Sequence, residues 1–234
     1  MKQRIGCLAL CASALLALPA AAYADGPPVK IDSGDTAWML LSAALVFLMT
    51  PGLAFFNGGM VRGKNVLSVL MQSFVSAGLV SVLCITVGYS LAFGPDHGRV
   101  IGDFSWAGLR GVSSFHGDGH YVQTVPHMLF MLFQMAFAII TPALVSGAIV
   151  ERMKFSSYVL FLLLWSLLIY APLAHMMWGY GGLLGMTGRV HALDFAGGTV
   201  VGNSGGDRFR GRCTCDGTSA GTSPFEERRR PAAT

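Results

Sequence analysis

Four long stretches without a charged side chain are the feature that most limits what this chain can fold into. A helix of about 20 apolar residues crosses a hydrocarbon core of about 30 Å. Backbone N–H and C=O groups in lipid need partners inside the protein, so such a segment has to be helical. The sequence therefore predicts an all-α polytopic membrane protein, with spans at residues 36–57, 66–93, 125–150 and 156–178.

The composition agrees with a membrane protein and argues against a soluble domain. Charged residues make up 12% of the chain, against about 25% in soluble domains. The basic residues sit at the ends of the apolar segments and in the last part of the chain, and no basic stripe with interleaved aromatic residues occurs. A nucleic-acid partner is therefore not expected. Cys84 lies inside an apolar run, where it is most simply a small buried side chain.

Residues 1–24 predict a cleaved signal peptide. Lys2 and Arg4 precede an apolar run, and the small residues of an A-x-A site precede Asp25. The alternative is a short first membrane helix, but Pro19 and the short apolar core favour cleavage. Removal of the leader would place the mature N-terminus outside the membrane.

The distribution of Lys and Arg predicts the same orientation. The short connections at 58–65 and 151–155 each hold two basic residues, and basic short loops stay on the inner side. The longer connections hold only scattered Arg residues. We therefore expect a multi-pass protein of the cell inner (plasma) membrane with its mature N-terminus outside.

The segment from residue 171 to residue 201 carries the most specific pattern in the chain. Residues 174–182 read AHMMWGYGG and residues 194–201 read DFAGGTVV. Both resemble the signature of the ammonium transporter (Amt/Rh) family, and the resemblance covers about residues 36–201. It implies an eleven-span fold of which this chain holds four to five spans, the fifth beginning at Asp194. It also implies transport of ammonium or ammonia through a hydrophobic pore and, in intact relatives, a homotrimer regulated by a PII signalling protein whose docking region is absent here.

The resemblance assigns three substrate-binding residues. Trp178 would otherwise be an interfacial tryptophan, but its motif resembles the outer ammonium-recruitment site of the family. Phe137 resembles the outer gate phenylalanine, whereas Phe133 is expected to be a packing residue. Asp194 is expected to cap the fifth helix and to set a negative potential below an outer vestibule, rather than to accept a proton.

No other group suggests chemistry. His175 is expected to be structural, and the remaining histidines are expected in solvated outer loops: His97, His116, His120, His127 and His191. None has the spacing of a metal site, and no span holds a catalytic acid–base pair or nucleophile. The sequence therefore predicts neither an enzyme nor a cofactor.

The chain departs from the family pattern after Val201. The family has a pore-lining histidine at the next position, where this chain has Gly202. Residues 202–234 are polar and rich in Arg, and they are expected to form a disordered, aberrant tail. Reading the codons for residues 206–216 one nucleotide later permits an apolar residue at every position, so we interpret the tail as a frameshift product; the alternative is a genuine basic tail.

Three functions remain open on this basis. The first is ammonium transport, lost or impaired in this truncated chain, because four spans and a stub leave a pore incomplete. The second is an inert remnant, and the third is a regulatory or sensor relative without transport. Uptake of ammonium distinguishes the first from the second, and PII binding tests the third.

Overall fold

The computed structural model describes residues 30–61, 63–115, 117, 120–149, 153–186 and 188–207. Four helical stretches within these ranges are long and apolar enough to cross a membrane, which confirms the predicted all-α membrane fold. They are built from α2 (Ser33–Met60), α3 (Val66–Leu83) with α4 (Tyr89–Phe93), α5 (His127–Ile149), and α6 (Phe155–Trp165) with α7 (Ala171–Trp178). The expected leader at 1–24 and residues 208–234 lie outside the described residues.

Two of the four stretches contain a widened, π-helical turn. Residues 84–88 join α3 to α4, and the Tyr89 N–H bonds the carbonyl of Cys84, five residues back. Residues 166–170 join α6 to α7 in the same way, with a bond from the Ala171 N–H to the Ser166 carbonyl. Such turns insert one residue into an α-helix and are frequent at functional sites.

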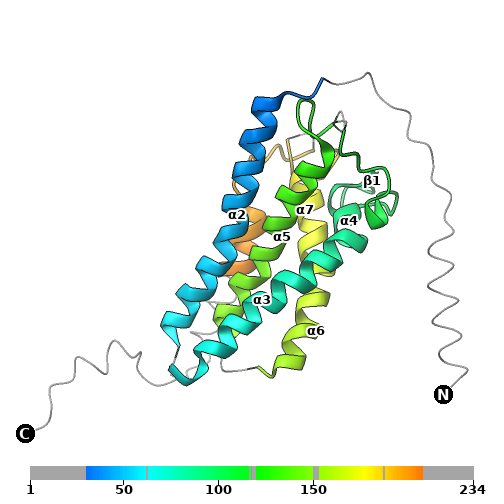
Figure 1. Ribbon diagram of the computed structural model, residues 1–234. Helices are drawn as coiled ribbons and strands as arrows, with labels where there is room; N and C mark the ends of the chain where they lie inside the picture. The colour runs from blue at the N-terminus through cyan, green and yellow to red at the C-terminus, as the bar shows by residue number, and fades with distance from the viewer. Residues whose placement is uncertain are drawn as a thin grey trace, which may run out of the picture.

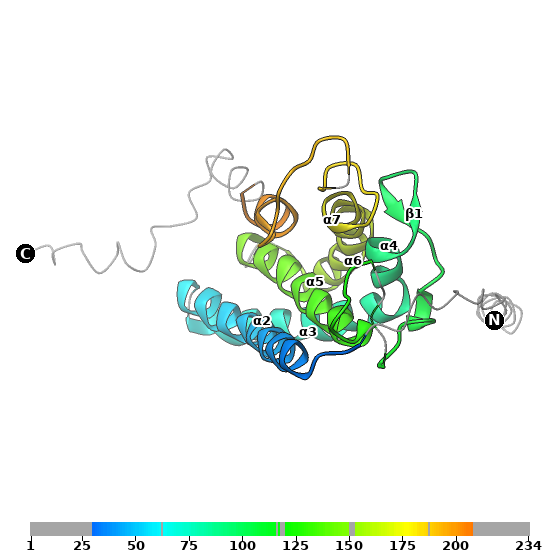
Figure 2. The same cartoon turned by 90° about the horizontal axis from the view of Figure 1, so that it is seen from above.

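Helix α5 is the central element of the bundle. Within an 18-residue apolar stretch of α5, 61% of the residues are buried inside the protein, whereas only 11% are buried in the corresponding stretch of α2. Figures 1 and 2 show α2 and α3 on one side of α5 and α7 on the other. Between α3 and α6, the Ser76 and Tyr158 hydroxyls share a buried hydrogen bond of 3.0 Å. The large apolar surface that α2 leaves exposed fits a lipid or protein neighbour.

A short hairpin lies at the end of the bundle where α4 and α7 finish (Figure 1). Strands β1 (Asp96–His97) and β2 (Ile101–Gly102) pair antiparallel, with Asp96 opposite Gly102. Gly98 and Arg99 have φ values of 76° and 68°, so the turn needs the left-handed conformation that glycine adopts easily. The Ser90 hydroxyl donates to the Asp103 carbonyl at 2.7 Å and ties the hairpin to α4.

The expectation that His127 is solvated is wrong. Its side chain is 2% exposed, and its Nε2 lies 2.7 Å from the Tyr89 hydroxyl. Its ring also packs edge-on against Trp106 at 4.7 Å. The loop folds back over the start of α5 and buries this histidine, whereas His97, His120 and His191 are exposed. His116 lies outside the described residues.

The fifth helical segment begins later and continues further than expected. The π-helical segment η5 spans Gly198–Asp207, so Asp194 precedes it by four residues. The boundary of a disordered tail at 202 is therefore wrong, because residues 202–207 continue the helix. Its packing against α5 is close: a Cβ added at Gly205 would lie 2.9 Å from the Thr141 carbonyl oxygen. Figure 2 shows this orange segment beside α5.

Candidate functional site

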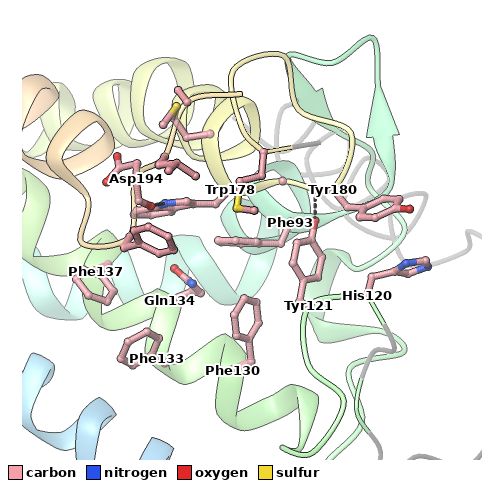
Figure 3. A pocket seen from close by; sticks show the side chains of 16 residues that line it. Phe93, His120, Tyr121, Phe130, Phe133, Gln134, Phe137, Trp178, Tyr180 and Asp194 are labelled. Atoms are coloured by element: carbon pink, nitrogen blue, oxygen red, sulfur yellow. Dashed lines mark hydrogen bonds between the residues drawn. The ribbon is translucent and has the colours of Figure 1, made fainter. Parts of the chain in front are cut away.

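A cavity of about 380 Å³ lies at the same end of the bundle as the hairpin. Its wall comes from the ends of α4 and α7, from one face of α5, and from the loop after α7. Half of the residues that line it are aromatic, and Figure 3 shows Phe93, Phe130, Phe137 and Trp178 around a common space. We call this space the vestibule; its aromatic wall consists of Phe93, Tyr121, Phe130, Phe133, Phe137, Trp178, Tyr180 and Phe195.

The structure brings the three predicted substrate-binding residues to this one cavity. The rings of Phe137 and Trp178 lie 6.2 Å apart at 59°, and Asp194 lines the same wall. Phe133, expected to be a packing residue, also lines the vestibule and meets Phe137 edge-to-face at 5.1 Å. The aromatic surface is therefore larger than the motif indicated.

Trp178 is fixed by a hydrogen bond to the loop that follows it. It is the last residue of α7, and its indole Nε1–H donates to the Asp194 carbonyl oxygen at 2.7 Å. Trp178 is half-buried, and the bond satisfies the single donor of its indole ring. The bond holds the Trp178 ring at the wall of the vestibule.

The carboxylate of Asp194 caps η5, as expected. Its Oδ1 accepts from the Gly198 N–H at 2.8 Å, and its Oδ2 accepts from Thr199 at 2.8 Å and Val200 at 3.2 Å. Backbone donors of a first helical turn have no partners inside the helix, so these bonds stabilise the start of the segment.

His175 has a structural role, as the motif implied. Its side chain is fully buried, and its Nδ1 lies 3.1 Å from the Ala92 carbonyl oxygen. Its Nε2 lies 3.1 Å from the Asp96 carboxylate. The ring thus joins α7 to α4 and to strand β1, one helical turn from Trp178. This linkage holds the aromatic wall in position.

Tyr121, Tyr180 and Gln134 are among the vestibule residues that were not predicted from the sequence. The Tyr121 hydroxyl accepts from the Tyr180 N–H at 2.8 Å, which draws two distant loops together. Gln134 lies one turn before Phe137 on α5 and turns toward the same space in Figure 3. Only its place three residues from Phe137, on one face of the helix, could have indicated this.

Comparisons with known proteins agree with this arrangement. Residues 37–207 match the Ammonium Transporter Family, so the match continues beyond Val201. An ammonium transporter of Bacillus subtilis is 54% identical over 173 residues, covering 74% of this chain and 41% of the relative. The crystal structure of Candida albicans Mep2 aligns with a TM-score of 0.66 at 33% identity, covering 74% of this chain and 36% of that one. A sensor Amt protein aligns with a TM-score of 0.61 at 27% identity, covering 71% and 40%. The chain thus spans about two fifths of the length of the curated relatives that it matches.

Proposed function

The chain belongs to the ammonium transporter family, and on that premise we propose that its described residues form the outer, cation-gathering part of an ammonium pathway. The observation that carries the proposal is the convergence of Phe137, Trp178 and the charged Asp194 on one vestibule. An aromatic face offers a cation about 0.5–2 kcal/mol. A carboxylate held by three backbone donors supplies charge without needing to touch the ion.

Passage beyond the vestibule would proceed through a hydrophobic pore as ammonia or ammonium. NH4+ resembles K+ in size, so hydrogen-bond donation and acidity rather than size would select it. The runner-up is a sensor relative, which the alignment with a sensor Amt protein favours. A PII protein would be the partner in that case, as in intact relatives of the transporter type.

The setting of the proposed pathway is a membrane. The family and the four apolar helical stretches indicate a multi-pass membrane protein. We propose the cell inner membrane, with the hairpin and vestibule outside and the short basic connections at 58–65 and 151–155 inside. A homotrimer is proposed for intact relatives, and the exposed apolar faces of the bundle are compatible with lipid or with neighbouring subunits.

Substitution of Trp178 by leucine tests the vestibule. The change removes a cation–π contact worth about 1–2 kcal/mol, so we expect binding of radiolabelled methylammonium to the chain in lipid nanodiscs to weaken about tenfold. Trp178→Phe should keep part of the affinity. Trp38→Leu is the matched control, because that side chain is 72% exposed on α2. Equal binding by Trp178→Leu and Trp38→Leu would remove Trp178 from the site.

We also propose that conduction is impaired in this chain. Position 202 offers no imidazole to host ammonia or relay its proton, and a glycine has no side-chain acceptor at all. The expected result is that liposomes holding the chain take up no more methylammonium than empty liposomes. Uptake above that level, abolished by Asp194→Ala, would contradict the impairment and support a working path.

A further inference from the structure

A second, smaller cavity lies in the bundle next to the vestibule and has no part in the function proposed above. Phe93 and Gln134 line both spaces, so these two side chains form the wall between them. The remaining lining comes from α3, α4, α5, α7 and the two π-helical turns. Its volume is about 20 Å³, and about 10–15 Å³ is enough for one water molecule.

The two π-helical turns border this cavity together. Cys84 and Gly88, the first and last residues of one turn, line it on one side. Ser166 and Tyr170, the first and last residues of the other turn, also line the cavity. Each turn accommodates one extra residue and so widens the helix locally. The space between α3–α4 and α6–α7 is therefore built by two specific backbone features.

Three polar atoms of the lining are buried without a hydrogen-bond partner among the described residues. They are Gln134 Oε1, the Ser166 hydroxyl and the Tyr170 hydroxyl, and the Thr141 side chain lies close to the last of these. Gln134 comes from α5, the two hydroxyls come from the two ends of one π-helical turn, and the other lining side chains are mostly apolar. A buried polar group without a partner costs about 1–3 kcal/mol. Three of them around one cavity of molecular size indicate a shared partner.

The geometry points to a binding site for one small neutral hydrogen-bonding molecule, water or ammonia, held by Gln134, Ser166 and Tyr170. An amide oxygen accepts, and a hydroxyl can both donate and accept, which suits either molecule. None of the lining residues is an acidic or basic side chain. A cation buried there would lose its hydration without gaining a counter-charge, so the site differs in chemistry from the vestibule.

A double-mutant cycle on the full chain in detergent tests the site. Gln134→Met and Tyr170→Phe each remove one polar group with little change of shape. If a molecule bridges them, each single substitution should lower the thermal midpoint by about 2–4 °C, and the double substitution should lower it by clearly less than the sum. If the groups have no shared partner, each substitution relieves a cost. The midpoints would then stay or rise and the effects would add, which would overturn the proposal.

Two further variants keep the test decisive. Ser166→Ala replaces Gln134→Met in the cycle if the latter does not fold. Thr50→Val is the matched control, because the Thr50 hydroxyl is also buried without a partner but lies on α2, away from the cavity. The change of the thermal midpoint in Thr50→Val should add to the change in Tyr170→Phe, because the two hydroxyls share no partner.

A titration with ammonia identifies the bound molecule. The total concentration of ammonia plus ammonium is held constant, and the pH is raised to increase the share of ammonia. A midpoint that rises with ammonia in the unmodified chain but not in Tyr170→Phe identifies ammonia, and coupling without this dependence identifies water. The double-mutant cycle measures thermal stability and does not depend on cation binding. The binding of methylammonium to Trp178→Leu therefore tests the vestibule and not the small cavity.

Discussion

Replacing Asp194 by alanine is expected to destabilise the chain by about 2–4 kcal/mol and to open η5. The carboxylate accepts three backbone N–H groups, from Gly198, Thr199 and Val200. Removal of a capping side chain costs about 0.5–2 kcal/mol, and a backbone donor left unpaired away from water costs more. The same loop holds the carbonyl that fixes the Trp178 indole. Binding of methylammonium should therefore fall together with stability.

The measurement is thermal unfolding in detergent, combined with hydrogen exchange of residues 198–207. Asp194→Asn keeps one carbonyl oxygen, so its stability should lie between those of the native chain and Asp194→Ala. Asp35→Ala is the control, because Asp35 is an exposed acidic residue in the first turn of α2 and its loss should change stability by less than 1 kcal/mol. Equal exchange of 198–207 in both alanine variants would show that the cap does not hold the segment.

Replacing Gly182 by alanine is expected to be the most disruptive small change in the loop after α7. A Cβ at this position would lie 2.2 Å from the His175 carbonyl oxygen and 2.6 Å from that of Met176. Both atoms belong to the backbone at the end of α7, so no side chain can rotate away. The loop has to move, and overpacking of this kind costs about 1–3 kcal/mol or more. The shift would also displace Tyr180 and Trp178 from the vestibule wall.

Gly78→Ala supplies the matched control for this clash. Gly78 lies in α3, and a Cβ there meets no atom within 4 Å. Alanine is a better helix former than glycine by up to about 1 kcal/mol, so this variant should be as stable as the native chain or more so. The comparison uses thermal midpoints and methylammonium binding. A Gly182→Ala variant that matches Gly78→Ala in both would show that the loop tolerates a side chain at this point.

The sequence determined the spans and the three vestibule residues for different reasons. An uncharged stretch such as 66–93 must be helical in lipid whatever packs beside it, because its backbone groups can pair only with one another. The capping role of Asp194 was also local, since a carboxylate before a helical turn meets that turn's free N–H groups. The choice of Phe137 and Trp178 came from the family resemblance, and the structure places both at one cavity.

Only the tertiary structure decided which polar residues are buried and which faces share a cavity. His127 reads as a loop residue, yet the segment before α5 folds over it and pairs it with Tyr89. The π-helical turns at 84–88 and 166–170 leave no trace in an apolar pattern, because a uniformly apolar segment has the same hydropathy whether or not one turn is widened. Gln134 could be placed on the face of Phe137, but its position between two cavities depends on how α5 meets α4 and α6–α7. Such contacts join residues far apart in the chain, and local sequence patterns do not encode them.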